Sequence, residues 1–160
     1  MKLCILLGSP RKQGNTAALV EEFLRQWEQF GEKSQVISLY EYRIGPCLGC
    51  MTCQDRMDGL GCVQQDDFAE LFQAMAEADL LLLATPIYAW YCTGPMKALL
   101  ERAIYAGNKN YGSQKGPALL AGTYVASLTT CGYPPEKGAD LWEEGLKRLC
   151  RHSKMNYLGM

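Results

Sequence analysis

The segment from Gly8 to Thr16, GSPRKQGNT, carries many groups that can bind a phosphate. It follows the short apolar run Leu3–Leu7 and precedes a stretch with helical spacing, so it would join a strand to the start of a helix. Free backbone N–H groups and the positive end of the helix dipole favour an anion there. Further donors come from the side chains of Ser9, Arg11, Asn15 and Thr16. The segment therefore predicts a phosphate site.

Two better-known phosphate loops are excluded by spacing. A P-loop needs four residues between its glycines and a lysine after the second, whereas five residues separate Gly8 from Gly14 and Asn15 follows. The Rossmann fingerprint Gly-x-Gly-x-x-Gly is absent. With a single histidine in the chain, His152, a Ser/His/Asp hydrolase is also disfavoured, so Ser9 is interpreted as a phosphate donor and not as a nucleophile.

Four of the eight cysteines have the spacing Cys-x2-Cys-x2-Cys-x8-Cys, and they are Cys47, Cys50, Cys53 and Cys62. Such spacing can bring thiolates around an iron–sulfur cluster, and four thiolates can also form a closed tetrahedral zinc site. Free or redox-active thiols are the third alternative, and the residues alone leave all three open. The remaining cysteines, Cys4, Cys92 and Cys150, are interpreted as packing residues, whereas Cys131 lies in a later loop.

The composition limits the class of protein. The chain has 160 residues, of which 48% are hydrophobic and 21% charged, which is typical of one globular domain. Sixteen basic and seventeen acidic side chains give a net charge of −1, which gives no reason to expect nucleic-acid or membrane binding. The longest apolar run is too short to cross a membrane, and no signal-peptide core is visible. We therefore expect a soluble cytoplasmic protein.

Strands and helices alternate along the chain. Strands are expected at 3–7, 35–40, 79–85, 119–128 and 155–160, and helices at 16–30, 66–75, 95–106 and 137–152. Between the second strand and the second helix, Glu41 to Gln65 form a cysteine-rich insert without a convincing period. The alternation predicts an α/β fold with a doubly wound, five-stranded parallel sheet in a three-layer sandwich. No helix follows the last strand to Met160, so we expect either that the sequence is trimmed there or that a partner covers one face of this strand.

Two motifs together resemble the NAD(P)H-dependent FMN reductases of flavodoxin-like fold. The first is Gly8 to Thr16, which is similar to the family pattern Gly-Ser-x-Arg-x-x-x-Asn-Thr. The second is TPIYAWYCTGPMKALLER, Thr85 to Arg102, which resembles Pro-x-Tyr … Gly-x-x-Lys-x-x-x-Asp-Arg with Glu101 in place of aspartate. The resemblance runs over the whole chain.

The resemblance implies FMN as cofactor and NAD(P)H as co-substrate. The FMN phosphate would be held by Ser9, Arg11, Gly14, Asn15 and Thr16. The flavin ring would be lined by Pro86, Ile87, Tyr88, Ala89 and Trp90, and its pyrimidine side closed by Thr129, Thr130, Cys131 and Gly132. Hydride transfer to the flavin needs no side-chain acid or base, so no catalytic residue is expected. All three loops would follow C-terminal strand ends, where doubly wound sheets bind ligands.

The cysteine spacing resembles the iron–sulfur flavoproteins, a branch of the same family that holds a four-iron cluster near FMN. The four cysteines are expected to converge beside the flavin site, because their segment leaves the second strand at the same C-terminal edge as the loops that would bind FMN. Two functions follow as hypotheses. The first is an FMN-dependent oxidoreductase that passes electrons from NAD(P)H to a quinone, a flavin or a similar acceptor. The alternative is an electron carrier with a cluster on the cysteine segment and a redox protein as partner. A regulatory FMN-binding module is a weaker third reading. Relatives of this family pair, and the aromatic loop 86–93 could border a second subunit, so we expect a homodimer.

Overall fold

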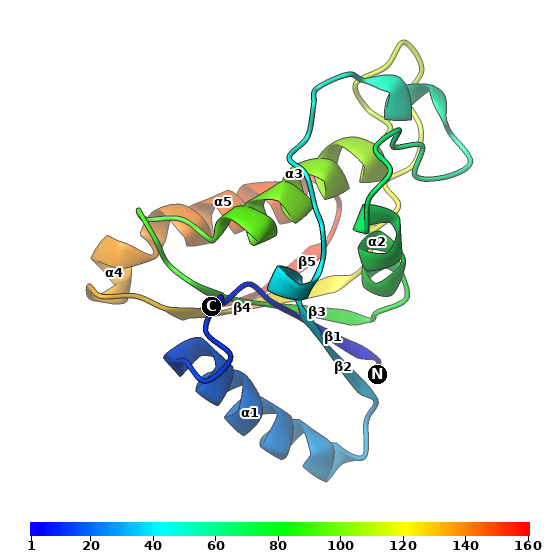
Figure 1. Ribbon diagram of the computed structural model, residues 1–160. Helices are drawn as coiled ribbons and strands as arrows, with labels where there is room; N and C mark the ends of the chain where they lie inside the picture. The colour runs from blue at the N-terminus through cyan, green and yellow to red at the C-terminus, as the bar shows by residue number, and fades with distance from the viewer.

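A computed structural model describes residues 1–160 as a five-stranded sheet covered by helices on both faces (Figure 1). The strands are β1 (Leu3–Leu7), β2 (Ser34–Ser38), β3 (Leu80–Pro86), β4 (Tyr124–Thr130) and β5 (Asn156–Gly159). All are parallel, in the order β2-β1-β3-β4-β5. This order is that of the flavodoxin-like fold and confirms the predicted fold class.

The helices divide unequally between the two faces of the sheet. The helix α1 (Asn15–Trp27) covers one face, and α2 (Phe68–Ala76), α3 (Gly94–Gly107) and α5 (Asp140–His152) lie on the other, with the short α4 (Pro135–Gly138) before α5 (Figure 1). The smaller core, around Val20, Leu3 and Leu82, lies under α1. The larger core, which includes Leu81, Leu99 and Trp142, lies under the other helices.

The central strand β3 is buried along its whole length, as the run DLLLLAT predicts for a strand between two helical layers. Its neighbour β4 is tied to α5 by a chain of hydrogen bonds. The Trp142 indole Nε1 donates to Ser127 Oγ at 2.9 Å, and Ser127 Oγ donates to the Leu83 carbonyl at 3.1 Å. A fully buried tryptophan with a satisfied N–H thus fixes α5 on the sheet.

Several element boundaries differ from the sequence prediction. The strand expected at 119–128 starts only at Tyr124, because Leu119 N donates to the Gly107 carbonyl and a turn with Gly122 at φ 87° precedes the strand. The helix expected at 137–152 is divided at Ala139, whose φ of −120° is not helical. The strand expected at 35–40 ends at Ser38, and a 3-10 turn at Leu39–Glu41 follows. The second helix, expected at 66–75, begins at Phe68 and ends at Ala76.

No helix in the structure is both long and apolar enough to span a membrane.

Candidate functional site

Three loops meet at the edge of the sheet where the strands end, and they enclose a pocket of about 400 Å³. The loops follow β1, β3 and β4, whose order in the sheet reverses between β1 and β3. Its lining consists of Ser9, Arg11, Gln13, Gly14, Asn15, Thr16, Pro86, Ile87, Tyr88, Thr130, Cys131 and Gly132. All of these except Gln13 are residues that the sequence singles out for a cofactor. The volume lies within the range of about 300–1,000 Å³ that is typical of cofactor and ligand sites.

The three loops are joined to one another by hydrogen bonds. The Thr130 carbonyl accepts from Ile87 N at 2.8 Å, and the Thr130 hydroxyl lies 2.7 Å from that of Thr16. At the base of the pocket, the Thr93 hydroxyl donates to the Gly8 carbonyl at 2.7 Å. Each of the three segments predicted from the sequence is therefore fixed by a hydrogen bond to another of them.

The loop after β1 leads into α1, and the uncapped start of this helix lies at the pocket. A side chain at Gly8 would be crowded, because a Cβ there would lie 3.0 Å from Thr93 Oγ1 and 3.3 Å from the Cβ of Met96. Gly14 stands at the N-cap of α1, and no side chain caps that helix. The N–H groups of its first turn therefore remain available to an anion in the pocket.

The charges around the pocket also favour an anion. Arg11 is the one charged residue in the lining, and no carboxylate shares it. Its neighbour Lys12 points elsewhere and pairs with Glu41 at 2.7 Å. The pocket-lining residues Ser9 and Thr16 are 6% and 2% exposed. The Ser9 hydroxyl donates to the Arg11 carbonyl at 3.3 Å, and the Thr16 hydroxyl contacts that of Thr130.

The remaining predicted residues lie close by. Ala89 and Trp90 line a second cavity of about 140 Å³, which shares Ile87, Cys131 and Gly132 with the first. Thr129 lies on β4 and lines neither cavity.

Sequence reasoning missed three residues of this region. Gln13 lines the main pocket, and Tyr133 and Gly138 line the second cavity. Their signals are weak, although Gln13 carries an amide inside the phosphate loop and Tyr133 directly follows the predicted Gly132.

The four clustered cysteines, Cys47, Cys50, Cys53 and Cys62, line a single small pocket together with Arg102, Tyr105 and Ala106 of α3. None of them forms a disulfide. No group of three metal-ligating side chains is spaced to hold one metal ion, so the structure presents no ready tetrahedral zinc site. This pocket shares no residue with the one at the strand ends.

The location of the cysteine pocket corrects an expectation. Because the insert leaves β2 at the C-terminal edge of the sheet, its cysteines were expected beside the cofactor loops. The insert instead runs along α3 to the far half of that helix (Figure 1). From Gly94 to Tyr105 the helix rises about 16 Å at 1.5 Å per residue. The two pockets therefore lie toward opposite ends of α3.

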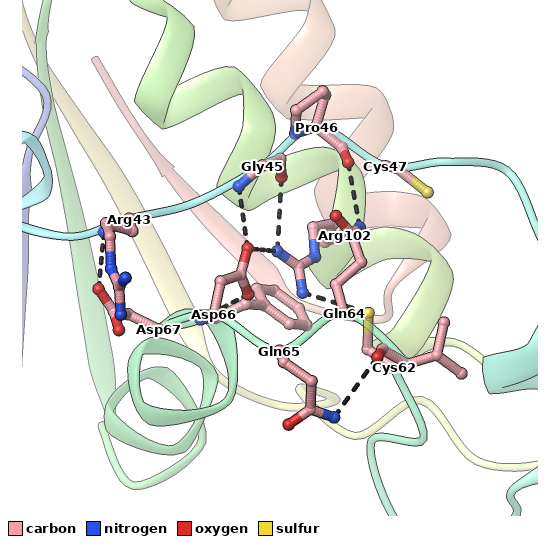
Figure 2. A network of polar contacts seen from close by, with 12 residues as sticks. Arg43, Gly45, Pro46, Cys47, Cys62, Gln64, Gln65, Asp66, Asp67 and Arg102 are labelled. Atoms are coloured by element: carbon pink, nitrogen blue, oxygen red, sulfur yellow. Dashed lines mark hydrogen bonds and ion pairs between the residues drawn. The ribbon is translucent and has the colours of Figure 1, made fainter.

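A buried arginine of α3 fixes the insert at this place (Figure 2). The Arg102 side chain is 1% exposed, and its Nη1 lies 2.5 Å from Asp66 Oδ2. Its Nη2 donates to Cys62 Sγ at 3.2 Å, and its Cζ lies 4.1 Å from the centre of the Phe68 ring. One guanidinium thus joins α3, the start of α2 and the last of the four cysteines.

Asp66 joins the start of the insert to the start of α2 through hydrogen bonds. Its Oδ2 also accepts from Gly45 N at 2.9 Å, and its Oδ1 accepts from Phe68 N at 3.3 Å. Burial alone would raise the pKa of Asp66, but the hydrogen bonds from Arg102, Gly45 and Phe68 outweigh it and lower that pKa. The carboxylate is therefore the anionic partner that the buried Arg102 requires.

A second buried cation lies under the insert. Lys109 is fully buried, and its Nζ donates to the carbonyls of Cys53 and Leu60 at 2.9 and 3.0 Å. Burial lowers the pKa of Lys109. Both acceptors are neutral. A second carboxylate also lies at the cysteines, because Cys47 N donates to Glu101 Oε2 at 3.4 Å, and burial raises the pKa of the Cys53 thiol.

Comparisons with known proteins place these features in a family. A family model described as NADPH-dependent FMN reductase matches residues 1–159. An iron–sulfur flavoprotein of Archaeoglobus fulgidus is 34% identical over 109 residues, which are 68% of this chain and 48% of that protein. Another, from Methanosarcina thermophila, is 29% identical over 124 residues, covering 76% of this chain and 63% of that protein. The chain thus spans about half the length of several curated relatives it matches.

Solved structures agree on the fold. An NAD(P)H:quinone oxidoreductase from Methanothermobacter marburgensis superposes with a TM-score of 0.69 at 19% identity, over 99% of this chain and 83% of that one. At this identity the likeness speaks for the fold alone.

The Asp66–Arg102 pair gives a test of how the insert is held. Asp66→Asn should lower the free energy of unfolding by about 3–5 kcal/mol at pH 7, because it leaves a buried guanidinium without its carboxylate. Asp67→Asn is the matched control, since the Asp67 side chain accepts from the Arg43 backbone N–H at 2.6 Å and pairs with no buried cation, so the change should cost about 1 kcal/mol.

The effect should also depend on pH. The pKa of Asp66 is lowered in the folded state. The ionised Asp66 carboxylate therefore contributes fully to the free energy of unfolding above the ordinary pKa of 3.8, and this contribution is lost as the pH falls through the pKa of the folded state. Urea unfolding should therefore show the gap between wild type and Asp66→Asn shrinking below about pH 4. A gap that stays the same from pH 7 into acid would contradict this role.

Proposed function

Because the chain belongs to the NADPH-dependent FMN reductase family, we propose that it binds FMN at the C-terminal edge of its sheet and passes electrons from NAD(P)H to a small-molecule acceptor. One observation supports the proposal more strongly than any other. The uncapped start of α1, the Arg11 guanidinium and the loops after β3 and β4 all border one pocket.

The donor set of that pocket fits the phosphate of FMN. Backbone N–H groups at Asn15 and Thr16, with the hydroxyl of Ser9 and the guanidinium of Arg11, supply the donors that a dianionic phosphate needs. The loops 86–88 and 130–132 are left to flank a planar ring at the other end of the pocket. When bound, FMN supplies the two-electron chemistry between the nicotinamide cofactor and the acceptor.

The chain's own residues then have binding and orienting roles. Arg11 and the α1 start fix one end of the cofactor, and the Thr130 contacts to Thr16 and Ile87 hold the walls of the pocket in register. The lining contains no histidine, lysine or carboxylate, and hydride transfer to a flavin needs no side-chain acid or base. We therefore assign no catalytic residue.

The proposal includes the cytoplasm as the location, on the ground that eight thiols in one chain suit a reducing compartment. It also includes a homodimer, supported by the half-exposed Tyr88 and Trp90 beside the pocket. Sedimentation that shows only monomer at micromolar concentration would exclude the dimer.

FMN titration of flavin-free protein tests the main proposal. Arg11→Ala and Asn15→Ala should each weaken FMN binding by about 1–3 kcal/mol, because each removes a hydrogen bond to a charged group. Lys12→Ala is the matched control, since Lys12 pairs with Glu41 outside the pocket and should leave the Kd unchanged. If both lining variants bind FMN as tightly as wild type does, the phosphate site lies elsewhere.

A second candidate function is an electron carrier with an iron–sulfur cluster on the insert. It is favoured by one pocket that gathers all four thiols next to the buried Arg102 and Lys109. The relatives named iron–sulfur flavoproteins support it as well. Thiolates are the ligands of such clusters, and the two cations would offset their negative charge. The donor chemistry fits this group, although the thiols do not share the spacing of a single-ion site.

Anaerobic reconstitution with iron and sulfide tests this second function. Wild type should take up about four irons per chain, as a cluster held by four cysteines requires, and Cys50→Ser should lose them. Cys150→Ala is the control, because Cys150 lies on α5 outside the pocket and should leave the iron content unchanged. No iron uptake by wild type, with full NADPH oxidation by Cys50→Ser, would exclude the carrier and leave the plain FMN reductase.

A further inference from the structure

The planar guanidinium of Arg102 has two differently occupied sides (Figure 2). On one side, Nη1 donates to Asp66 Oδ2 at 2.5 Å and to the Gly45 carbonyl at 3.4 Å. Nε and Nη2 form the other edge of the fork, where Nη2 donates to Cys62 Sγ at 3.2 Å. Nε is buried and has no hydrogen-bond partner. Since a buried donor without an acceptor is unfavourable, this edge is arranged for more acceptors than the protein supplies.

The acceptors available to this edge are sulfur atoms. Arg102 lines the small pocket that also contains all four clustered cysteines, and it is the one charged residue in that lining. No carboxylate lines the pocket. Hydrogen bonds to sulfur are one of the means by which a protein sets the reduction potential of an iron–sulfur cluster. The unused donor of Arg102 therefore lies where such a bond would form.

The inner side of the pocket is fixed, whereas its outer side has room. Cys53 is 8% exposed, with its thiol 3.4 Å from a carbonyl of α3, and Cys62 is held by Arg102. Cys50 is exposed, and a Cβ on the neighbouring Gly49 would meet nothing within 4 Å. The pocket itself measures about 20 Å³, which is space for one water molecule. A group of several atoms therefore needs the outer turn to give way, while Arg102 keeps its place on the inner side.

The other charges near the thiols do not donate to sulfur. Glu101 accepts from Cys47 N at 3.4 Å and forms an ion pair with Lys97. Lys109 Nζ donates to two backbone carbonyls. Arg102 thus differs from the neighbouring cation Lys109, because its N–H groups reach a thiol directly.

We propose that the Nε–Nη2 edge of Arg102 donates hydrogen bonds to the sulfurs of an iron–sulfur cluster on the insert and raises its reduction potential. This inference rests on the second candidate function, the electron carrier. One-electron reduction by a redox protein adds one negative charge and forms or breaks no bond. Hydrogen bonds from a cation stabilise the more negative state more strongly, so reduction becomes easier. Arg102 is a positioning residue in this role and not a ligand.

The midpoint potential of the reconstituted cluster tests this role. Arg102→Gln should shift the potential to more negative values, because it removes the charge and part of the fork. Arg102→Lys keeps the charge and loses the fork, so its potential should lie between those of wild type and Arg102→Gln. Arg148→Gln is the control, because Arg148 is exposed on α5, pairs with Glu144 and does not line the thiol pocket. A potential that is unchanged in Arg102→Gln would overturn the inference.

Asp66→Asn separates this role from a merely structural one. Asp66 is the anionic partner of Arg102, so its neutralisation leaves more positive charge at the thiols and should shift the potential to less negative values. If Arg102 only holds the insert in place, Asp66→Asn and Arg102→Gln would both loosen the insert and shift the potential in the same direction. Equal directions would therefore overturn the inference.

A measurement on wild type keeps the test decisive if Arg102→Gln does not fold or takes up no iron. Pulsed EPR of the reduced cluster, in protein labelled with 15N in its arginine guanidinium groups, should show a 15N coupling that is lost in Arg102→Lys. Iron uptake without this coupling would overturn the inference and leave the electron carrier intact. No iron uptake by wild type would overturn the electron carrier and this inference with it.

Discussion

The end of β4 holds the candidate site together through one residue, Thr130. Its carbonyl accepts from the loop after β3, and its hydroxyl meets the start of α1. Both contacts depend on the sheet order, which puts β4 next to β3 and β3 next to β1, so that three loops end at a common edge. Without this order, the donors at Gly8 to Thr16 would face no opposite wall. The sheet order is thus the constraint that places two opposite walls beside the uncapped start of α1 and so completes the pocket.

The helix α3 connects this pocket to the cysteine insert. Its first residues pack against the phosphate loop, where Thr93 donates to the Gly8 carbonyl. Its later residues carry Arg102, and the loop after it carries Lys109. Two buried cations at that end bind the insert through carbonyls, one carboxylate and one thiol. One rigid element therefore separates two chemically distinct sites, one polar and made of backbone donors, the other made of thiols.

The sequence was sufficient for features with a strong local signal. The all-apolar run of β3 and the donor-rich segment after β1 predicted the sheet type and most of the pocket lining, since both depend on short stretches of chain. The sequence was insufficient for features that depend on contacts between residues far apart in the chain. The late start of β4 depends on a hydrogen bond between Leu119 and Gly107, and the position of the insert depends on the ion pair between Arg102 and Asp66. The signal for Tyr133 was weak, because its position depends on close packing against Gly138, and nothing in the sequence distinguishes that glycine from others.

The central claim is that the C-terminal edge binds FMN through its phosphate at the start of α1. The most direct measurement is the Kd of flavin-free protein for FMN and for riboflavin, which differ only by that phosphate. The account predicts that FMN binds about tenfold to a hundredfold more tightly, as charge-assisted hydrogen bonds to the phosphate require. Equal affinities for the two flavins would contradict it.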